Sequence, residues 1–372
     1  FAGAFITSLL LTLLAYVALS RGNGSYSKIA TRVLGNKLGK FYTVLTIVIL
    51  GPLYAIPRMS AAAWDSIVQA FGLNSQSRLP LIIFIIIVII VVGKGLIDPI
   101  STPVAKSYEG SAFSYGFTNG YATAEILCAL IFGVVILNSL KEKGISEDRM
   151  SKNIIRVGII GIALLTLTHL CHMLIGASTG GTIDLTYTAL YTEVATQLLG
   201  KAGGVLFSVA LFFAALTTAI GMTSGCAEFF VDTTQGKIDY KKASISILVL
   251  STIFGCMGLS SILELLGPIL DGIYPAAIVL VIYYAIMPNN QNEKNLKVCS
   301  YAMITALVFG AIDTIYAYGI KLNIDLGIIN KFYEALPLSS EKLAWVPWTV
   351  LVAIIGYFIF RCKREKIDDV VS

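Results

Sequence analysis

Long runs of apolar residues without a charge constrain this chain more than any other feature of its sequence. The stretches Leu79–Val92 and Ala243–Leu263 contain no charged side chain. A helix needs about 20 mostly apolar residues to cross about 30 Å of hydrocarbon. Of the 372 residues, 13% are charged, against about 25% in an average soluble domain. We therefore expect an all-α integral membrane protein built as a multi-span helical bundle.

Ten segments have the length and apolar character of membrane spans, and they predict one transmembrane domain over residues 1–372. They run roughly over Ala2–Ser20, Leu38–Ala70, Leu79–Leu96, Gly116–Leu140, Asn153–Ile175, Ala202–Val231, Ala243–Ser260, Ile262–Met287, Leu296–Ile320 and Leu343–Arg361. Two other stretches, Thr182–Gly200 and Asn323–Ser340, are expected to be irregular or interfacial.

Lysine and arginine gather in the short connections, which predicts how the helices are oriented. The basic connections are 21–40, 141–156, 237–242 and 294–297, and the tail at 361–366 is also basic. The positive-inside rule places all of them in the cytoplasm. Three predicted helices separate the first basic connection from the second. Two connections on the same side of the membrane must be separated by an even number of spans. Either a helix is absent near Phe71–Pro80, or one of the three is not a full span.

Several classes of function are disfavoured by the same composition. The net charge of +5 comes from loops and forms no basic stripe with interleaved aromatics, so nucleic-acid binding is not expected. His169, Cys171 and His172 lie close together, but no further ligand cluster supports a metal site. No Ser/His/Asp set argues for a hydrolase. We expect neither an enzyme nor a cofactor or resident metal.

Two segments interrupt predicted helices with residues that favour kinks or breaks. In the first, Pro52 and Pro57 flank Tyr54 inside the second helix, and each proline removes a backbone donor. In the second, Gly116–Glu125 places two glycines, an asparagine and two threonines at the start of the fourth helix. Transporters use such breaks to bind substrates with freed backbone groups. A packing kink and a frayed helix start are the structural alternatives.

Glu125 lies one turn beyond this second break, at a depth where an ionisable group is a candidate for gating or proton transfer. The alternative is a carboxylate that snorkels or is hydrogen-bonded by a neighbour. Asp271 and Asp313 also lie within apolar helices. Each is either a proton or ion group or a member of a satisfied polar pair.

A third segment, Ala214–Glu228, is rich in small and hydroxyl residues. Ala214, Thr217 and Thr218 have i, i+3, i+4 spacing, so one carbonyl and two hydroxyls share a helix face. Hard oxygen ligands of this kind suit cations. Serine and threonine also often bond back to their own helix, which is the simpler explanation.

At these segments the chain resembles the branched-chain amino acid:cation symporter family, the bacterial system II carriers for leucine, isoleucine and valine. The matching stretches are Gly51–Ser60, Gly116–Gly133, Ala215–Phe230 and Tyr274–Ile282. The family belongs to the amino acid–polyamine–organocation superfamily. The resemblance implies a leucine-transporter-type fold, with five plus five helices in an inverted repeat followed by two more.

The resemblance also implies site residues and a mechanism. It equates the fourth predicted helix with the family's sixth, and the sixth with the family's eighth, which carries cation ligands. The implied substrate-binding residues are Tyr54, Asn119, Gly120, Tyr121, Ala122 and Thr123. The implied cation ligands are Ala214, Thr217 and Thr218, for a transported sodium ion or proton. The implied activity is cation-coupled symport of branched-chain amino acids by alternating access in a bacterial inner membrane.

The chain also departs from the family pattern. The family's first helix, with its glycine-rich break, is expected before Phe1, and another is expected between Gly72 and Leu79. Ten of twelve helices are therefore predicted here. In this fold the first helix supplies much of the site, so the alternative function is an inactive transporter fragment or a non-transporting membrane sensor or scaffold.

Overall fold

Every element of the computed structural model is helical within the residues that the structure describes, which are 2–21, 25–62, 97, 111–179, 185, 187–286 and 293–371. Six of these helices are long and apolar enough to cross a membrane. They are Ala2–Arg21, Asn36–Ala62, Arg149–Ala177, Ala189–Thr233, Leu259–Ile286 and Glu293–Lys321. A shorter apolar helix covers Trp345–Ile359. The described residues thus form the multi-span helical bundle that the apolar runs predict.

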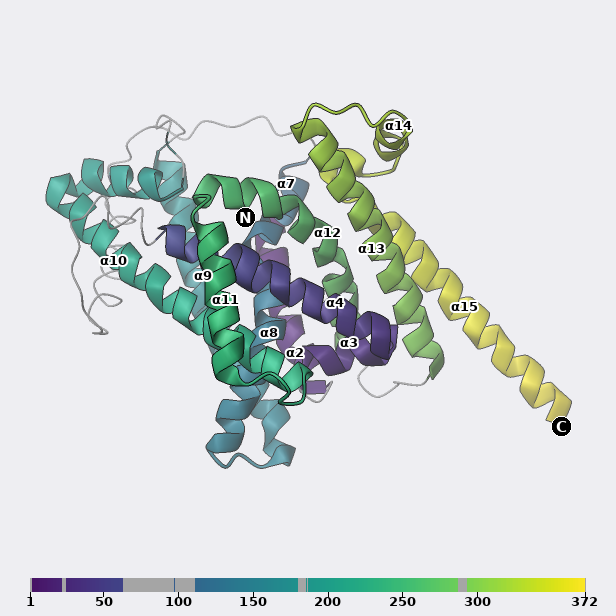
Figure 1. Cartoon of the computed structure of the whole chain (residues 1–372). Coiled ribbons are helices and arrows are strands. Elements are labelled where there is room, and N and C mark those ends of the chain that lie inside the picture. The colour runs from purple at the N-terminus through teal and green to yellow at the C-terminus, as the bar shows by residue number, and fades with distance from the viewer. Residues whose placement is uncertain are drawn as a thin grey trace.

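The helices lie side by side in a bundle, with short helical pieces at its ends (Figure 1). The first part of the chain contains α1 (Ala2–Ala4), η1 (Phe5–Leu10), α2 (Leu11–Arg21), α3 (Tyr26–Leu34), α4 (Asn36–Val48) and η2 (Ile49–Ala55). The middle contains α7 (Ala112–Asn119), η3 (Gly120–Thr123), α8 (Glu125–Glu142), α9 (Glu147–Ser178) and α10 (Tyr187–Thr233). The last part contains α11 (Tyr240–Gly255), α12 (Leu259–Ile286), α13 (Glu293–Lys321), α14 (Ile328–Glu334), η4 (Ser339–Glu341) and α15 (Trp345–Val371).

The proline-containing segment of the second spanning helix is wound as a π-helix. This turn, η2, contains Pro52, which cannot donate a backbone hydrogen bond. The Pro52 carbonyl accepts a hydrogen bond from the Ser251 hydroxyl of α11 at 2.9 Å. The helix then continues to Ala62. The helix therefore changes its winding around Pro52 and continues through Pro57 without ending.

Helices α12 and α13 approach each other through two glycines. A methyl group added at Gly310 would lie 2.1 Å from the carbonyl oxygen of Gly272, and one at Gly272 would lie 2.7 Å from the carbonyl oxygen of Gly310. No side chain larger than hydrogen fits between these backbones. Small residues at helix interfaces allow such close contact in membranes, where packing is a main source of helix association.

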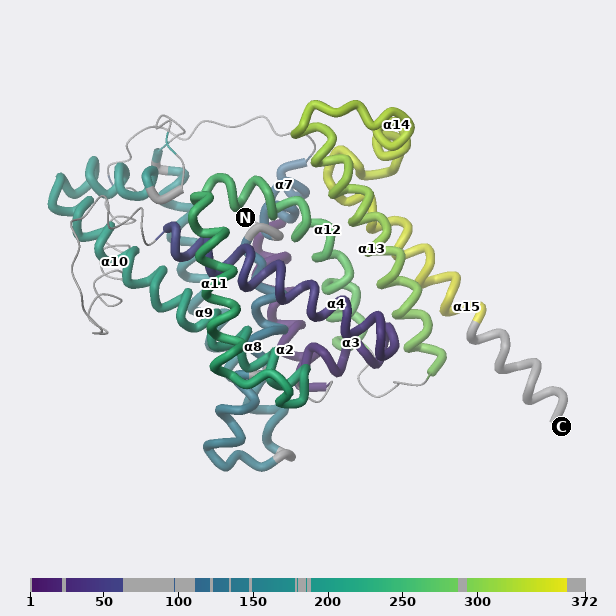
Figure 2. The backbone as a smooth tube through the Cα atoms, viewed as in Figure 1, coloured from purple at the N-terminus to yellow at the C-terminus, as the bar shows by residue number. Residues whose placement is uncertain are grey.

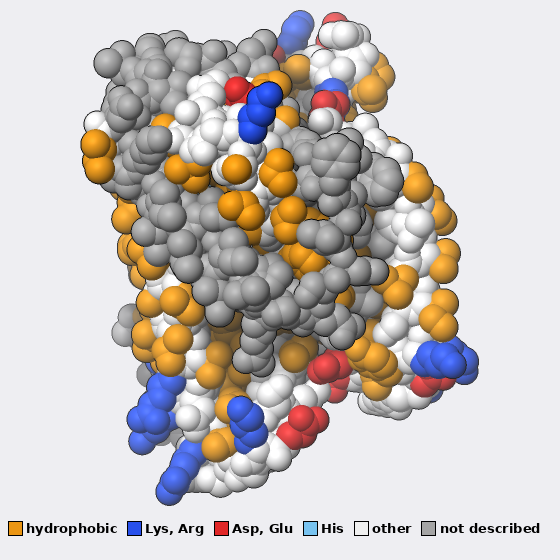
Figure 3. Space-filling view, turned by 90° about the vertical axis from the view of Figure 1, so that its left-hand side faces the viewer, with side chains coloured by type: hydrophobic (Ala, Val, Ile, Leu, Met, Phe, Trp, Pro, Cys, Tyr) orange, Lys and Arg blue, Asp and Glu red, His pale blue; other side chains and the backbone are white. Residues whose placement is uncertain are grey.

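The outer faces of the bundle are apolar. Ile160 and Leu164 of α9 are each 63% exposed, and only 11% of the most apolar part of Arg149–Ala177 is buried. Figure 3 shows hydrophobic side chains at many places on one face, with several Lys and Arg side chains at its lower end and others near its top. Contiguous exposed apolar surface of this kind needs lipid to cover it.

The basic connections lie toward the same end of the bundle. The α8–α9 turn, the α10–α11 turn and α3 all lie in the lower half of Figure 1, and α13 begins and α15 ends there as well. The residues before α14 and the start of α7 lie at the opposite end. Between the first two basic connections, the described chain crosses the bundle once through Asn36–Ala62 and once through α7 and α8.

Most predicted spans agree with the structure to within a few residues, but the predictions differ from it in two regions. Residues 187–199 of the segment expected to be irregular or interfacial are helical and lead into a bend at Gly200, whose φ is 75°. Figure 2 shows α10 turning along its course. The span predicted over Gly116–Leu140 is divided into α7, η3 and α8. Leu79–Leu96 and the helix expected to be absent near residues 72–79 fall outside the described residues.

Candidate functional site

The chain leaves the regular α-helix between α7 and α8. The helix α7 begins at the N-cap Ser111, whose side chain accepts from the Ser114 backbone amide at 3.1 Å. After Asn119 the chain tightens into the 3-10 turn η3. Ala124 then takes a left-handed conformation with φ 55° and ψ 21°, although it is not a glycine. Such a residue is strained by about 1–2 kcal/mol, so packing around the break must hold it in place.

The first spanning helix, Ala2–Arg21, which we call the N-terminal helix, supplies part of that packing. Thr7 is fully buried, and its hydroxyl donates to the Phe117 carbonyl of α7 at 2.8 Å. A methyl group added at Gly120 would lie 2.7 Å from the Thr7 Cβ atom. One added at Gly3 would lie 2.1 Å from the Phe113 carbonyl oxygen. The two helices therefore touch backbone to backbone at Gly3, whereas Gly120 packs against the buried Thr7 side chain, and a methyl group fits at neither position unless its neighbours shift.

The Glu125 carboxylate contacts polar groups of both the break and α9. Its Oε1 atom lies 2.8 Å from His169 Nε2, and the Glu125 and His169 side chains are 12% and 29% exposed. Its Oε2 atom lies 2.9 Å from the Thr123 hydroxyl, which also lies 2.6 Å from the Gly120 carbonyl. Glu125 was a candidate from the sequence, whereas His169 was a candidate only as a metal ligand. No short-range pattern links the two, because α9 brings the histidine to the break through tertiary packing.

The other predicted substrate residues occupy different environments. Asn119 is exposed, and its side-chain amide donates to the Tyr115 carbonyl at 2.8 Å. The backbone of Tyr121 and Ala122 forms the 3-10 turn, and their side chains lie outside what the structure describes. Tyr54 is buried on η2.

The Tyr54 ring lies beneath the Arg58 guanidinium, whose carbon is 5.6 Å from the ring centroid. The Tyr54 hydroxyl accepts from Arg58 Nη1 at 3.4 Å. A cation over an aromatic face is attracted by the ring quadrupole. Tyr54 therefore belongs to the packed core in this structure, and a contact with substrate stays a prediction.

The predicted cation ligands converge on one carbonyl of α10. The Thr217 and Thr218 hydroxyls donate to the Ala214 carbonyl at 2.9 and 2.8 Å. Thr217 also lies 3.0 Å from the Phe213 carbonyl. Both threonines are exposed. Their hydroxyls are thus bonded back to their own helix, and a shared cation at these three oxygens stays a prediction.

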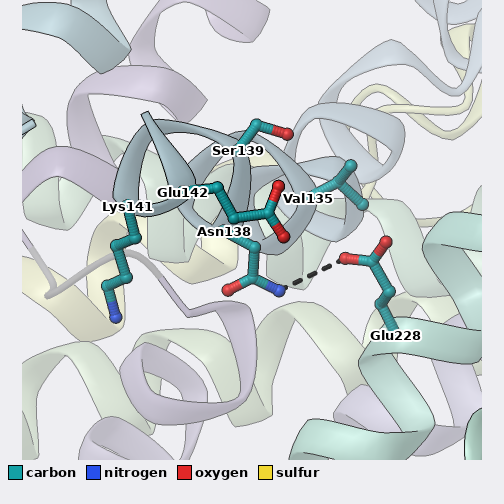
Figure 4. Close-up of a pocket in the computed structure, with 6 residues that line it drawn as sticks. All are labelled: Val135, Asn138, Ser139, Lys141, Glu142 and Glu228. Carbon is teal, nitrogen blue, oxygen red and sulfur yellow. Dashed lines mark hydrogen bonds between the residues drawn. The ribbon is translucent and has the colours of Figure 1, made fainter. Parts of the chain in front are cut away.

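Two cavities lie next to these elements. One of about 530 Å³ lies between the N-terminal helix and α9, and His169 is among the residues that line it. The other, of about 310 Å³, lies between the end of α8 and α10 (Figure 4). There Asn138 donates to Glu228 Oε2 at 3.2 Å, while the Lys141 side chain points away. No group of three or more metal-ligating His, Cys, Asp or Glu side chains occurs in the described part of the chain.

A family model described as branched-chain amino acid transport protein matches residues 1–92 and 79–363. The chain belongs to this family of branched-chain amino acid transport proteins. The two matches overlap over residues 79–92 and together include the broken helix, the proline-containing helix and the threonine segment. The family and the apolar helices place the chain in the cell membrane as a multi-pass protein.

Curated relatives are similar over nearly the whole chain. The branched-chain amino acid permease BrnQ of Escherichia coli strain K12 is 28% identical over 403 aligned positions, covering 99% of this chain and 89% of the relative. A branched-chain amino acid transport system 2 carrier protein of Pseudomonas aeruginosa is 29% identical, with 98% and 90% covered. The BrnQ permease of Bacillus subtilis strain 168 is 28% identical, with the same coverage. These relatives are named as permeases or carriers, which move a solute without converting it.

Proposed function

We propose that this chain carries leucine, isoleucine and valine into the cell together with a cation, sodium by preference, through alternating access. The observation that carries the proposal is the break at Gly120–Ala124, which lies inside a family-matched span. Membrane helices keep non-helical backbone only where it is buried in protein or lines a cavity. A transported ligand that needs backbone partners accounts for such a break.

The ends of the two half-helices are complementary to the charged ends of a free amino acid. The C-terminal end of α7 presents carbonyl groups, which suit an ammonium group, and the N-terminal end of α8 presents amide groups, which suit a carboxylate. The Ile126 amide of α8 already donates to the Tyr274 hydroxyl at 3.4 Å. We place the main-chain groups of the substrate between these ends, with Asn119 at the rim.

The apolar core beside the break suits a branched side chain. Ile126, Leu127 and Leu130 of α8 are fully buried and belong to the large core cluster that also includes Tyr54. Burial of a leucine-sized side chain is worth about 1.5–3 kcal/mol. A straight polar or charged side chain would gain nothing from this environment, so the proposal predicts selectivity for leucine, isoleucine and valine.

The cation is assigned to Ala214, Thr217 and Thr218. Each threonine oxygen keeps lone pairs when its proton points elsewhere, so both can bind a cation beside the Ala214 carbonyl. An inward sodium gradient would then drive uptake. Moving one elementary charge across 100 mV is worth about 2.3 kcal/mol, which supports roughly fifty-fold accumulation.

Uptake into proteoliposomes tests this function. The full chain is reconstituted, and entry of radiolabelled leucine is followed with an inward sodium gradient and with potassium in its place. The proposal predicts accumulation only with sodium, and competition by unlabelled isoleucine and valine but not by lysine. Leucine binding without uptake would favour the sensor or scaffold instead. The absence of both leucine binding and leucine uptake would refute a role in branched-chain amino acid transport.

A further inference from the structure

The cavity of about 530 Å³ between the N-terminal helix and α9 has no role in the proposed transport. Among the described residues, these two helices alone form its lining. The apolar side chains include Phe5, Ile6 and Leu9 on the N-terminal helix. On α9 they are Leu170 and Met173. A cavity of about 150 Å³ can hold a benzene molecule, so this cavity has room for a much longer hydrocarbon.

The polar side chains in the lining are already hydrogen-bonded elsewhere. The hydroxyls of Ser8 and Thr166 each donate to a carbonyl one turn earlier in their own helix, at 2.5 and 2.7 Å. Both ring nitrogens of His169 are engaged, one by the Leu165 carbonyl and the other by Glu125 Oε1, each at 2.8 Å. Burial of a polar ligand against partners that are already engaged is unfavourable. The lining therefore suits an apolar ligand and disfavours the charged ends of a free amino acid.

The cavity is continuous with the apolar outer surface of the bundle. Two of its lining side chains, Phe5 and Leu170, are 50% and 43% exposed, so the cavity reaches that surface. On α9 the exposed stripe continues from Leu170 through Leu167 and Leu164 at a spacing of three residues, which keeps them on one helix face. Exposed apolar surface on a membrane-spanning helix is covered by lipid. Lipid is therefore the apolar ligand at the mouth of the cavity.

Both helices place the cavity in the same half of the bilayer. Leu9 precedes Arg21 by 12 residues, and Thr166 follows Arg156 by 10 residues, which corresponds to about 18 Å and about 15 Å of helix. The two arginines belong to the basic connections 21–40 and 141–156. Because the hydrocarbon is about 30 Å thick, the cavity extends from near its centre toward the surface opposite these connections. The positive-inside rule makes this the outer half.

We propose that this cavity binds one acyl chain of an outer-leaflet phospholipid. The end of the chain lies near Leu9 and Thr166, and the part closer to the head group lies near Phe5 and Met173. The chain fills a space that would otherwise leave the lining side chains without dispersion contacts. The described lining contains no Lys, Arg, Asp or Glu side chain, so the site binds the hydrocarbon and leaves the head group at the membrane surface.

The bound chain also supports the helix break from outside. Thr7, next to the lining residue Ser8, is fully buried and donates to the Phe117 carbonyl of α7. The lining residue His169 contacts Glu125 at the start of α8. A chain packed between the N-terminal helix and α9 therefore stabilises the two helices that hold these contacts. The lipid site does not depend on the proposed transport.

Cross-linking to a photoreactive phospholipid tests the site without any substrate. The full chain is reconstituted in phosphatidylethanolamine and phosphatidylglycerol vesicles that contain a trace of phosphatidylcholine with a diazirine on one acyl chain. A terminal diazirine should label the peptides around Leu9 and Thr166, and a diazirine close to the head group should label those around Phe5 and Met173, as identified by mass spectrometry. Even labelling along the exposed face of α9 by both lipids would overturn the site. So would labelling that leaves the peptide around Phe5 untouched, because another part of the protein would then cover the cavity.

Two threonines of α9 provide matched variants. Thr166→Phe places an aromatic ring in the cavity, whereas Thr168→Phe places the same ring on an exposed part of α9 outside the lining. Both hydroxyls donate to carbonyls of their own helix, so both variants lose the same kind of hydrogen bond. Thr166→Phe should reduce the labelling around Phe5 and Met173 severalfold, and Thr168→Phe should preserve it. Equal labelling of the two variants would contradict a chain bound in the cavity.

Thermal unfolding provides a second measurement on the same proteins. After delipidation in detergent, the unfolding midpoint of the parent and of Thr168→Phe should rise as phosphatidylglycerol is added, because a ligand that binds the folded state stabilises it. Thr166→Phe should gain less, because its ring already occupies the space. An equal gain in all three proteins would overturn the proposal, since lipid would then act through the general surface alone. If Thr166→Phe does not fold, the labelling pattern of the parent still decides the site.

Discussion

Substitution of Gly120 by alanine tests the packing that holds the helix break. The added methyl group would lie 2.7 Å from Thr7 Cβ and 3.2 Å from Thr7 Cγ2, whereas carbon atoms in contact prefer about 3.5–4.0 Å. Thr7 is fully buried and is held by its hydrogen bond to the Phe117 carbonyl. The side chain therefore cannot move away without disturbing the contact between the N-terminal helix and α7.

The expected loss of stability follows from these contacts. Overpacking of a filled site costs about 1–3 kcal/mol, and loss of the Thr7 hydrogen bond adds about 0.5–1.5 kcal/mol. The lower entropy of the unfolded alanine chain returns about 0.4–1 kcal/mol. Gly120→Ala should therefore lower the free energy of unfolding by about 0.5–4 kcal/mol.

Gly161→Ala is the matched control, because Gly161 lies within α9 and a methyl group there would meet nothing within 4 Å. Alanine is favoured over glycine in a helix by about 1 kcal/mol, so this variant should be neutral or slightly more stable. Equilibrium unfolding in mixed micelles measures both variants. Equal free energies of unfolding for Gly120→Ala and Gly161→Ala would refute the close packing at the break. A leucine at position 120 would meet the same Thr7 side chain, so Gly120→Leu tests packing before it tests substrate binding.

Three further predictions concern the break, the cation and the contact between α14 and α13. Ala124→Gly should relieve the left-handed strain and raise the midpoint of thermal unfolding, whereas Ala124→Val should lower it. Thr217→Val and Thr218→Val should each raise the sodium concentration for half-maximal leucine uptake, and unchanged sodium dependence in both would move the cation elsewhere. The burial of Tyr333 and the charge of Asp313 raise the pKa of the Tyr333 hydroxyl, so this hydroxyl stays protonated and donates a hydrogen bond to Asp313. Tyr333→Phe should lower the free energy of unfolding by about 1–3 kcal/mol, because it leaves the half-buried Asp313 carboxyl without this donor.

The apolar runs predicted the spans well because hydrocarbon thickness fixes their length, independently of packing partners. Fewer long spans occur among the described residues than the ten predicted from the sequence, for reasons that the helices themselves show. The helix at Gly116–Leu140 is divided at Ala124, and α11 has 16 residues. The helix before Gly200 was missed because its polar residues resemble those of a loop, and only the bend itself had a glycine to mark it.

The candidate site was predictable where the signal lies within one segment. Gly116 and Gly120 pointed to the break, and the spacing of Thr217 and Thr218 placed their oxygens on one face. The partner of Glu125 was not predictable, because His169 reaches it through the packing of α8 against α9. The requirement for glycine at position 120 likewise depends on Thr7, a residue more than one hundred positions earlier in the chain.

The most direct test of substrate binding at the helix break is protection of a cysteine placed at its rim. Asn119→Cys is made in the full chain after the native cysteines are replaced, and Ile238→Cys, in the exposed α10–α11 turn, serves as the control. The rate of modification by a water-soluble thiol reagent is measured with and without saturating leucine. We predict that leucine, isoleucine and valine slow modification at position 119 and that lysine does not, while the rate at position 238 stays constant. Equal rates at position 119 with and without leucine would contradict substrate binding at the break.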